Sequence, residues 1–343
     1  MSVLATGWDI GGVHLKTARL ESRGAGRRLI WRQQAFEIWR RPDRLATALR
    51  RLDGRDDGGA RAVTLTAELS DVFPGRAAGV RAVLAAVSTA LDRRPYRVLD
   101  SAGDLLAEGA ARRAPLRVAS ANWMAPALVA ARRAGRGLLV DIGSTTTDIV
   151  PFAGGLPRPD GTDDRGRLTT GELVYSGVLR TPPAALAATV PLGAGLCRTI
   201  PEFFTQMADV YVILGRLGPG DYTTATPDGR GRGRRDCAAR LARLVGAEAR
   251  DLSAGEIRGI AGHLMERQVE TIAAAIRAVA ARPGCGRAPM AVVCGAGRFL
   301  AEEAARRVGC RPVPLEAIVP GFGRDWGRVA PAASLALLAA GAA

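Results

Sequence analysis

GWDIGGVHLKTARL, residues 7–20, and LVDIGSTTTDIVPF, residues 139–152, are two copies of one pattern. In each copy an apolar strand ends in Asp-Ile-Gly, a small residue follows, and a second strand begins. A strand, a glycine turn and a further strand predict a β-hairpin. One such hairpin in each half of the chain predicts a duplicated fold whose two lobes close on a ligand between them.

The two turns carry residues that suit a phosphorylated ligand. Glycine lets the backbone approach a ligand closely, and successive turn N–H groups form a concave site for an anion. Asp9 and Asp141 precede the turns and are expected to hold Mg²⁺, because a carboxylate repels phosphate but binds the metal that bridges to it. The alternative is that each aspartate only caps its turn. The expected phosphate donors are Gly11, Gly12, Gly143, Ser144, Thr145 and Thr146.

A third element, AVVCGAGRFLAEEAARR at residues 291–307, has the pattern of a strand, a glycine turn and a helix. The N–H groups at the start of a helix favour an anion there. Gly295 and Gly297, in the turn at 294–298, are therefore expected to lie at the phosphate. The turn lacks the third glycine of G-x-G-x-x-G, and the chain contains no G-x-x-x-x-G-K-[ST] loop, so both common nucleotide motifs are absent.

Lys16 is the only lysine among the 48 Lys+Arg residues, and Asn122 is the only asparagine. This composition is typical of a strongly G/C-biased genome, in which arginine replaces lysine wherever it is accepted. A lysine that remains in a phosphate hairpin is predicted to bind phosphate, because a compact ammonium fits where a planar, forked guanidinium does not. The alternative is chance placement.

Composition argues against several functional classes. The net charge is +15, but the arginines are scattered as pairs and only 5% of residues are aromatic, so no specific nucleic-acid partner is expected. No apolar run reaches the ~18–20 residues that span a bilayer, and no signal peptide is recognised. Five cysteines without a C-x-x-C pair and two histidines leave zinc without ligands. We expect a cytoplasmic protein that does not bind membranes, and homo-oligomerisation stays open.

Strands and helices alternate along the 343 residues, which indicates an α/β architecture with room for two domains. We expect a first lobe at 1–120, a second at 121–330, and a terminal helix at 331–343 that packs back on the first. The polar segments 153–171 and 218–235 are expected to be loops or hairpin excursions. Expected strands include VLATGWDI, RAVTLTAEL, RVLD, RVAS, GLLVDI, DVYVIL and MAVVCG, and expected helices are 42–52, 76–93, 121–134, 236–246, 253–281 and 298–308.

Further polar residues extend the candidate site. Glu68 and Asp71 follow an apolar strand, where side chains of α/β proteins tend to face the ligand; an acid pair at a helix start is an equal alternative. Asn122 either contacts substrate or caps the helix that follows it. Glu172 and Arg180 are further substrate-binding candidates, because arginine pairs with carboxylate or phosphate. For Arg180 a surface salt bridge is the alternative.

The early Asp-Ile-Gly, the central Asp-Ile-Gly-Ser-Thr-Thr-Thr-Asp and the late Gly-x-Gly before a helix resemble the sugar kinase/actin-like ATPase superfamily. The chain is more similar still to the hydantoinase/oxoprolinase-like proteins linked to tetrahydromethanopterin-dependent one-carbon metabolism, and among them to a synthase family of methanofuran biosynthesis. Stretches that carry this resemblance include TLTAELSDVF, SANWMA, GELVYSGVLRTP, DVYVILG, TPDGR and CGAGRFL. The resemblance implies a duplicated, ribonuclease H-like fold of two lobes around a central phosphate-binding cleft.

The resemblance also implies an activity. The family joins an aminomethylfuran diphosphate to the phenol oxygen of tyramine, γ-glutamyltyramine or a tyrosine analogue, releasing pyrophosphate, in methanofuran or methylofuran synthesis. The hairpins and the 294–298 turn would then bind diphosphate with Mg²⁺ and no organic cofactor. Lys16 and Asp9 would stabilise the departing pyrophosphate, and Glu68 or Asp71 would accept the phenol proton.

Two other functions stay open. A small-molecule kinase of the sugar-kinase type would transfer a phosphoryl group from ATP, which is a cofactor only in this alternative. A non-catalytic nucleotide-binding subunit of a hydantoinase-like complex would bind a nucleotide without turnover and hold a stable protein partner.

Overall fold

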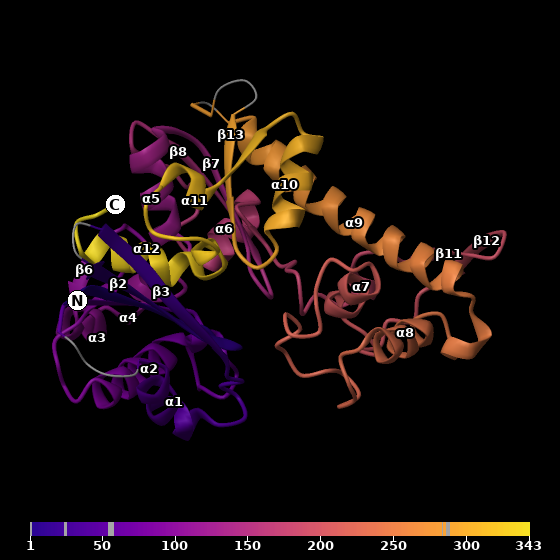
Figure 1. Cartoon of the computed structure of the whole chain (residues 1–343), viewed down its shortest axis with the longest axis horizontal. Coiled ribbons are helices and arrows are strands. Elements are labelled where there is room, and N and C mark those ends of the chain that lie inside the picture. Colours follow the sequence, from indigo (N-terminus) through magenta and orange to yellow (C-terminus); the bar gives the residue numbers. More distant parts are fainter. Residues whose placement is uncertain (1, 24–25, 54–57, 283, 286–288) are drawn as a thin grey trace.

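The computed structural model describes residues 2–23, 26–53, 58–282, 284–285 and 289–343. Two mixed β-sheets, each covered by helices, form its centre (Figure 1). The first sheet is built from the N-terminal part of the chain and the second from the middle and the C-terminal part. In the described residues no helix is both long and apolar enough to cross a membrane.

The first sheet contains β1 (Ser2–Ile10), β2 (His14–Arg23), β3 (Gly26–Ala35), β4 (Ala60–Leu65), β5 (Arg97–Leu99) and β6 (Leu105–Ala107). Their order is β3-β2-β1-β4-β5-β6. β1 and β2 pair antiparallel and form the first predicted hairpin, and β3 continues this antiparallel pairing. On its other side β1 runs parallel to β4, which runs parallel to β5.

The second sheet contains β7 (Arg136–Ile142), β8 (Thr147–Ala153), β9 (Leu156–Pro157), β10 (Leu173–Val174), β13 (Met290–Cys294) and β14 (Arg311–Pro314). Their order is β10-β8-β7-β13-β14, and β9 pairs with β8. β7 and β8 form the second predicted hairpin. β7 runs parallel to β13, which runs parallel to β14. The second sheet therefore repeats the strand directions of the first.

The two hairpin turns are closed by the same backbone hydrogen bond. The Gly11 N–H donates to the His14 carbonyl over 3.0 Å, and the Gly143 N–H donates to the Thr146 carbonyl over 2.9 Å. The matching sheets and turns confirm the predicted duplicated α/β fold of two lobes.

This duplication aligns the charged residues of the hairpins one by one. Asp9 on β1 lies opposite Lys16 on β2, and Asp141 on β7 lies opposite Asp148 on β8. Asp9 is thus equivalent to Asp141. Lys16 is equivalent to Asp148, so the two lobes present opposite charges at the same position.

Two helices, α5 (Met124–Ala134) and α12 (Ala330–Ala339), pack in the core between the sheets. This core joins residues of both sheets, among them Leu20 and Leu139, to Leu335 of α12. α12 also contacts β1, β2 and β4 of the first lobe (Figure 1). The helix predicted at 331–343 therefore begins one residue earlier and ends at Ala339. Pro331, in its first turn, has the fixed φ that suits a helix start.

The other helices surround the sheets. The first lobe has the 3₁₀ turns η1 (Pro42–Arg44) and η2 (Ala67–Leu69) and the helices α1 (Leu45–Asp53), α2 (Arg76–Ala90), α3 (Glu108–Arg113) and α4 (Pro115–Val118). The second has α6 (Asp164–Thr170), η3 (Pro183–Ala185), the hairpin β11 (Thr189–Leu192) and β12 (Gly195–Arg198), α7 (Met207–Ile213), α8 (Arg234–Arg243), η4 (Ala249–Asp251), α9 (Ala254–Ala280), α10 (Arg298–Arg307), α11 (Leu315–Ile318) and η5 (Trp326–Val329). α9, predicted at 253–281, reaches from the second sheet to β11 and β12 (Figure 1).

The strand predicted for DVYVIL is wrong, because this segment lies in α7. All residues of α7 are buried, so its sequence has no polar face, and a short apolar run does not separate a buried helix from a buried strand. A capping box between Gln206 and Asp209 starts the helix, which is the helix signal that the strand prediction overlooked.

Two more local predictions are wrong. RVAS does not form a strand: Pro115 begins the short helix α4, and only one bridge, between Leu65 and Ala119, joins this segment to a strand in the described part of the chain. The segment 153–171, predicted to be a loop or hairpin excursion, begins with the β8–β9 hairpin but also contains α6, whose first turn is capped by Asp163. In both segments a local signal starts the helix, Pro115 for α4 and Asp163 for α6. The glycines, prolines and charged residues around these signals are typical of loops, so the sequence pattern did not reveal the helices.

Candidate functional site

A cavity of about 290 Å³ lies between the two hairpins, and we call it the hairpin cavity. The second hairpin contributes its turn and both strands, and the first contributes β2. The predicted residues that line it are Lys16, Asn122, Asp141, Gly143, Ser144, Thr146 and Gly295. The fold therefore places these predicted phosphate-site residues, including the lone lysine, around one cavity.

Lys16 is held in place by Asp9. The Lys16 ammonium donates to Asp9 Oδ2 over 3.2 Å, because the two residues lie opposite each other on β1 and β2. Burial alone would lower the pKa of Lys16, but the charges of Asp9 and Asp141 outweigh burial and raise it. The ammonium is therefore charged at neutral pH and faces the cavity. Asp9 itself is only 2% exposed and does not line the cavity.

Asp141 faces the hairpin cavity without a cation of its own in the described residues. Burial, together with the nearby charge of Asp148, raises the pKa of Asp141 to about 7. Asp148 forms an ion pair with the buried Arg167 over 2.7 Å. Three carboxylates thus share two cations, Lys16 and Arg167, so the site has an excess of negative charge.

This charge balance fits a divalent cation. Asp141 faces the cavity and offers carboxylate oxygens, whereas Asp9 Oδ1 is buried behind Lys16 and accepts no hydrogen bond from the described residues. Within the same residues no group of three or more His, Cys, Asp or Glu side chains is placed to hold a metal ion. Mg²⁺ takes only one or two protein carboxylates and completes its shell with water and phosphate, so the donor set suits Mg²⁺ bound together with a diphosphate.

A second cavity of about 490 Å³ adjoins the first, and we call it the aromatic cavity. Three residues, Asn122, Thr146 and Asp148, line both cavities. The walls of the aromatic cavity also include Gly12, Val13, Trp39, Leu69, Trp123, Thr145, Leu173, Tyr175 and Arg180. Three aromatic rings beside aliphatic side chains make it suitable for flat, apolar groups.

Two arginines stack on the tryptophans of this cavity. The Arg180 guanidinium lies 5.2 Å from the ring centre of Trp39, and that of Arg167 lies 4.1 Å from the ring centre of Trp123. Such contacts orient the rings and keep the cationic groups at the wall. Arg180 and Asn122, both predicted to bind substrate, line the aromatic cavity.

Glu68 lies behind the wall of the aromatic cavity. Its Oε1 accepts a hydrogen bond of 2.9 Å from the Ser120 hydroxyl, and Ser120 lines the cavity. Burial raises the pKa of Glu68 to about 7, although Ser120 and Arg76 oppose the shift. Asp71, the second predicted proton acceptor, lines the cavity directly.

The raised pKa of Glu68 predicts a pH-dependent stability. Between pH 4.5, which is the ordinary pKa of a glutamate, and about pH 7, the unfolded chain loses the carboxyl proton of Glu68 while the folded protein keeps it. The folded state is therefore destabilised as pH rises through this range, by about 3 kcal/mol at pH 8. Glu68→Gln removes this effect. Urea unfolding at pH 4.5 and pH 8 is expected to show the variant gaining stability relative to wild type at the higher pH. Parallel pH profiles would contradict the assignment.

Several predicted residues are not brought to either cavity. Glu172 is fully buried and accepts from the backbone N–H groups of Asp160 and Gly161, over 2.8 and 2.9 Å, so it stabilises a loop. Gly297 permits close packing: a Cβ there would lie 2.4 Å from Ile142 Cγ2. The Gly11 N–H is used within its own turn. Side-chain type and spacing do not reveal such structural roles.

Other residues that line the cavities or support their walls were not among the predicted site residues. Asp148 lines both cavities, and the hairpin alignment, which places it at the position of Lys16, was the signal for it. Arg167 and Trp39 had no such signal, because each reaches the site from a distant segment. His14 also lines the hairpin cavity, and burial, with the charges of Lys16 and Arg180, lowers its pKa to about 3, so it is neutral.

The segment 218–235 forms one wall of the hairpin cavity. Asp221 lines it and forms an ion pair of 2.5 Å with Arg328, and Thr223 lies 2.6 Å from His14 Nε2. The contact between Thr223 and His14 joins the second lobe to the first hairpin. Although this segment is irregular, as expected for a loop, it is part of the site.

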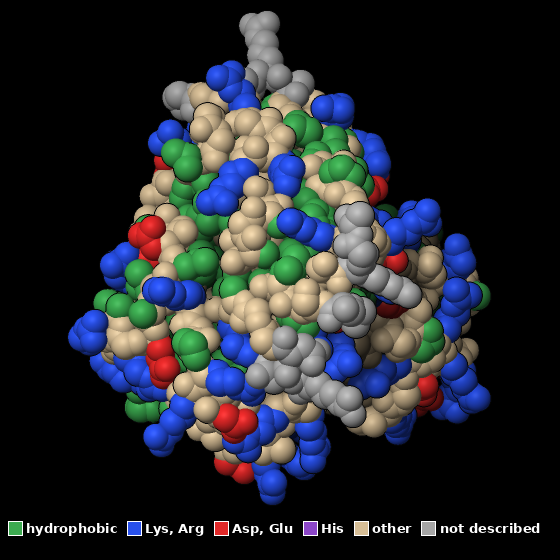
Figure 2. All heavy atoms as spheres, turned by 60° about the vertical axis from the view of Figure 1, so that its left-hand side comes forward, with side chains coloured by type: hydrophobic (Ala, Val, Ile, Leu, Met, Phe, Trp, Pro, Cys, Tyr) green, Lys and Arg blue, Asp and Glu red, His purple; other side chains and the backbone are tan. Residues whose placement is uncertain are grey.

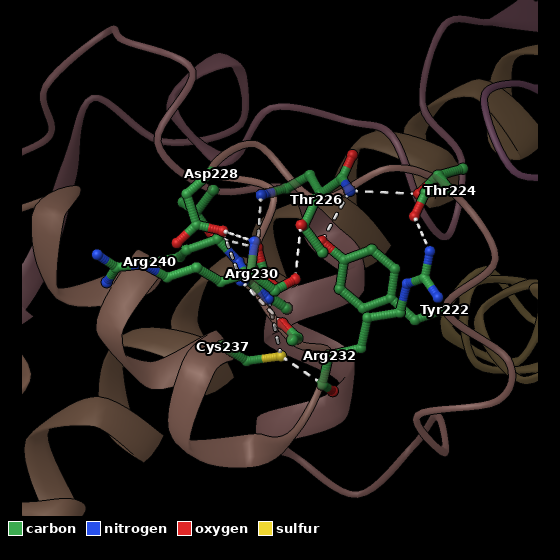
Figure 3. A network of polar contacts seen from close by, with 12 residues as sticks. Tyr222, Thr224, Thr226, Asp228, Arg230, Arg232, Cys237 and Arg240 are labelled. Atoms are coloured by element: carbon green, nitrogen blue, oxygen red, sulfur yellow. Dashed lines mark hydrogen bonds and ion pairs between the residues drawn. The ribbon is translucent and has the colours of Figure 1, made fainter. Parts of the chain in front are cut away.

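A buried network holds this loop in one conformation. Arg240, fully buried on α8, pairs with Asp209 over 2.7 Å and with Asp228 over 3.0 Å. The Gln206 amide donates to the hydroxyls of Tyr222 and Thr224. Figure 3 shows Tyr222, Thr224, Asp228 and Arg240 of this network close together. Breaking a buried ion pair is costly, so the loop is firmly anchored.

The chain is similar in sequence to known proteins. The model of the hydantoinase/oxoprolinase family matches residues 59–322. A protein of Methanocaldococcus jannaschii named (4-{4-[2-(gamma-L-glutamylamino)ethyl]phenoxymethyl}furan-2-yl)methanamine synthase is 32% identical over 82% of this chain and 83% of its own length. A protein of Methanococcus vannielii with the same name is 27% identical over 59% of this chain and 89% of its own length.

Among solved structures, the nucleotide-free structure of acetone carboxylase resembles this one. Its TM-score is 0.60 at 12% sequence identity, over 98% of this chain and 70% of that chain. At this identity the likeness concerns the fold, and it agrees with the duplicated two-lobe arrangement.

Proposed function

The chain belongs to the hydantoinase/oxoprolinase family, and from this premise we propose that it is a transferase of methanofuran biosynthesis that forms a furfuryl–aryl ether. The phenol oxygen of a tyramine derivative replaces the diphosphate of an aminomethylfuran diphosphate, and pyrophosphate leaves. One observation carries the proposal: a charged cavity suited to diphosphate meets an aromatic cavity suited to two flat rings. The relatives' name describes a product with this phenoxymethylfuran bond.

The hairpin cavity would stabilise the leaving group. As the furfuryl C–O bond breaks, its electron pair moves to the pyrophosphate, and negative charge builds there. The Lys16 ammonium, held by Asp9, and the hydroxyls of Ser144 and Thr146 face this charge. Preorganised donors of this kind lower the barrier because they act more strongly on the transition state than on the substrate. Bound Mg²⁺, held by Asp141, would supply further positive charge there.

The aromatic cavity would orient the phenol. Its hydroxyl would lie at Asp148, the carboxylate that lines both cavities. Burial raises the pKa of Asp148 although the charge of Arg167 opposes the shift, so Asp148 is a stronger base than an exposed aspartate. The phenol proton passes to Asp148 as the new ether C–O bond forms. Asp148 thus replaces Glu68 and Asp71 as the proposed proton acceptor.

The test is a pyrophosphate-release assay with Mg²⁺, the aminomethylfuran diphosphate and γ-glutamyltyramine or tyramine, with mass spectrometry of the product. We expect one pyrophosphate for each ether formed. Asp148→Asn is expected to lower kcat by about two orders of magnitude, with Asp71→Asn as the matched control that keeps most activity. Absence of an ether with every phenol would overturn the proposal.

One observation favours the kinase alternative. A further cavity of about 260 Å³ at the start of α10 continues the hairpin cavity, sharing Asp221, Gly295, Ala296 and Arg328 with it. This space is lined by three arginines and three carboxylates (Arg216, Arg298, Arg328, Asp221, Glu302 and Asp325), and the N–H groups at the start of α10 could face a phosphate of a nucleotide. ATP turnover with a small alcohol, in place of ether formation, would support this second function.

A further inference from the structure

Two continuous surface hollows lie beside the aromatic cavity and are lined by arginine. They measure about 330 and 870 Å³ and share Arg40, Ala225 and Arg232. Arg41 lines the smaller hollow and Arg230 the larger. The four arginines come from both lobes: two follow β3, and two belong to the 218–235 loop. We call the pair of hollows the arginine groove.

The arginine groove has unpaired positive charge. Among the described residues its one acidic lining residue is Glu37, which forms an ion pair of 2.6 Å with Arg40. Arg232 lies over the Tyr222 ring at 5.9 Å and donates to the Thr224 carbonyl. Arg41 and Arg230 are exposed, and neither forms an ion pair with a carboxylate in the part of the chain that the structure describes. The groove is therefore ready to bind an anion.

The arginine groove is continuous with the hairpin cavity and the aromatic cavity. The smaller hollow shares Val13 with the aromatic cavity and Thr223 with the hairpin cavity. In a tyramine derivative the hydroxyl and the aminoethyl chain lie at opposite ends of the ring. A phenol whose hydroxyl reaches Asp148 can thus extend its chain past Val13 into the groove.

The loop that carries Arg230 is rigid. The Arg230 N–H donates to Asp228 Oδ1 over 3.1 Å, its carbonyl accepts from Thr226 Oγ1 over 2.8 Å, and Asp228 is held by the buried Arg240 (Figure 3). The backbone is fixed while the side chain stays exposed, which reduces the entropy lost on binding. Arginine is common elsewhere on the surface, where it is spread among other side chains (Figure 2). The groove differs because its arginines line one hollow that opens on the site.

We propose that the arginine groove binds the carboxylate of a γ-glutamyl tail on the phenolic substrate and thereby selects tailed phenols over tyramine. This inference rests on the proposed function. Arginine and carboxylate form charge-assisted, often bidentate hydrogen bonds, and the relatives' name contains a γ-glutamylamino group. A longer acidic tail would contact more of the groove and bind more tightly.

The test compares γ-glutamyltyramine with tyramine in the ether-forming assay. Arg230→Gln and Arg41→Gln are each expected to raise KM for γ-glutamyltyramine about tenfold and to leave kcat unchanged. Neither should alter KM for tyramine. Arg41→Lys, which keeps the charge, should restore part of the loss. Arg235→Gln is the matched control, because Arg235 is exposed on α8 and lines neither hollow. Equal KM changes for both phenols would overturn the proposal.

Two further measurements distinguish a carboxylate site from a pyrophosphate site. If the groove binds the departing pyrophosphate, Arg230→Gln will weaken product inhibition by pyrophosphate and leave KM for γ-glutamyltyramine unchanged, which overturns the proposal. Calorimetry with γ-glutamylglutamate needs no turnover. If wild type binds γ-glutamylglutamate about ten times more tightly than Arg230→Gln does, the groove proposal is supported even when no phenol gives an ether. The absence of an ether would then defeat only the proposed function. Equal or absent binding in both proteins overturns the groove.

Discussion

Lys16→Arg is expected to lower kcat/KM for ether formation by about two orders of magnitude, and Lys16→Met by at least as much. The Lys16 ammonium is the cation of the first hairpin that faces the hairpin cavity, and Asp9 fixes its position over 3.2 Å. An arginine at this place keeps the charge, but its guanidinium is longer and planar and cannot occupy the same point between Asp9 and Asp141. The loss should appear mainly in kcat, because the charge acts on the departing pyrophosphate.

The single lysine also permits a chemical test. A lysine-directed acylating reagent can modify only Lys16 and the N-terminal amine of the chain. Because the pKa of Lys16 is raised and acylation needs the neutral amine, the reaction is run at alkaline pH. Mass spectrometry is then expected to show that pyrophosphate with Mg²⁺ protects Lys16 from acylation and leaves the N-terminal amine reactive. Wild-type kcat/KM in Lys16→Arg, together with unprotected acylation, would show that the lysine has no part in diphosphate binding.

Gly7→Ala is expected to destabilise the protein by about 3 kcal/mol or more. A Cβ at Gly7 would lie 2.0 Å from the Ala332 carbonyl oxygen and 2.7 Å from the Ala336 nitrogen. These are backbone atoms of α12, so no side-chain rotation relieves the clash, and the helix must move away from β1. Since α12 fills the core between the two sheets, its displacement affects both lobes.

Chemical unfolding in urea measures this effect, with Gly259→Ala as the matched control. Gly259 is exposed in α9, and a Cβ there meets nothing within 4 Å. The control is expected to gain about 0.5–1 kcal/mol, because alanine favours a helix more than glycine does. Similar unfolding midpoints for wild type and Gly7→Ala would contradict the close packing of α12 on β1.

Local pattern was sufficient where the fold depends on neighbours in sequence. The hairpin turns, the strands that flank them and α9 follow from glycine position, apolar periodicity and a capping box, all of which are written in short segments. The same reasoning failed for α7, because a segment buried on every side has no polar face from which to tell a helix from a strand. It also failed for Glu172, whose buried hydrogen bonds with Asp160 and Gly161 are a property of the folded loop.

By itself, the sequence determined the duplication, the two Asp-Ile-Gly turns and the place of the lone Lys16 in the first hairpin, because each of these lies within one short segment. Only the tertiary structure decided which residues from distant segments face these hairpins. The approach of the two lobes places Asp148 where the cavities meet, brings Arg167 onto Trp123, and joins the 218–235 loop to the first hairpin. Contacts between segments that are far apart along the chain depend on the packing of whole sheets and helices, and no local pattern encodes them.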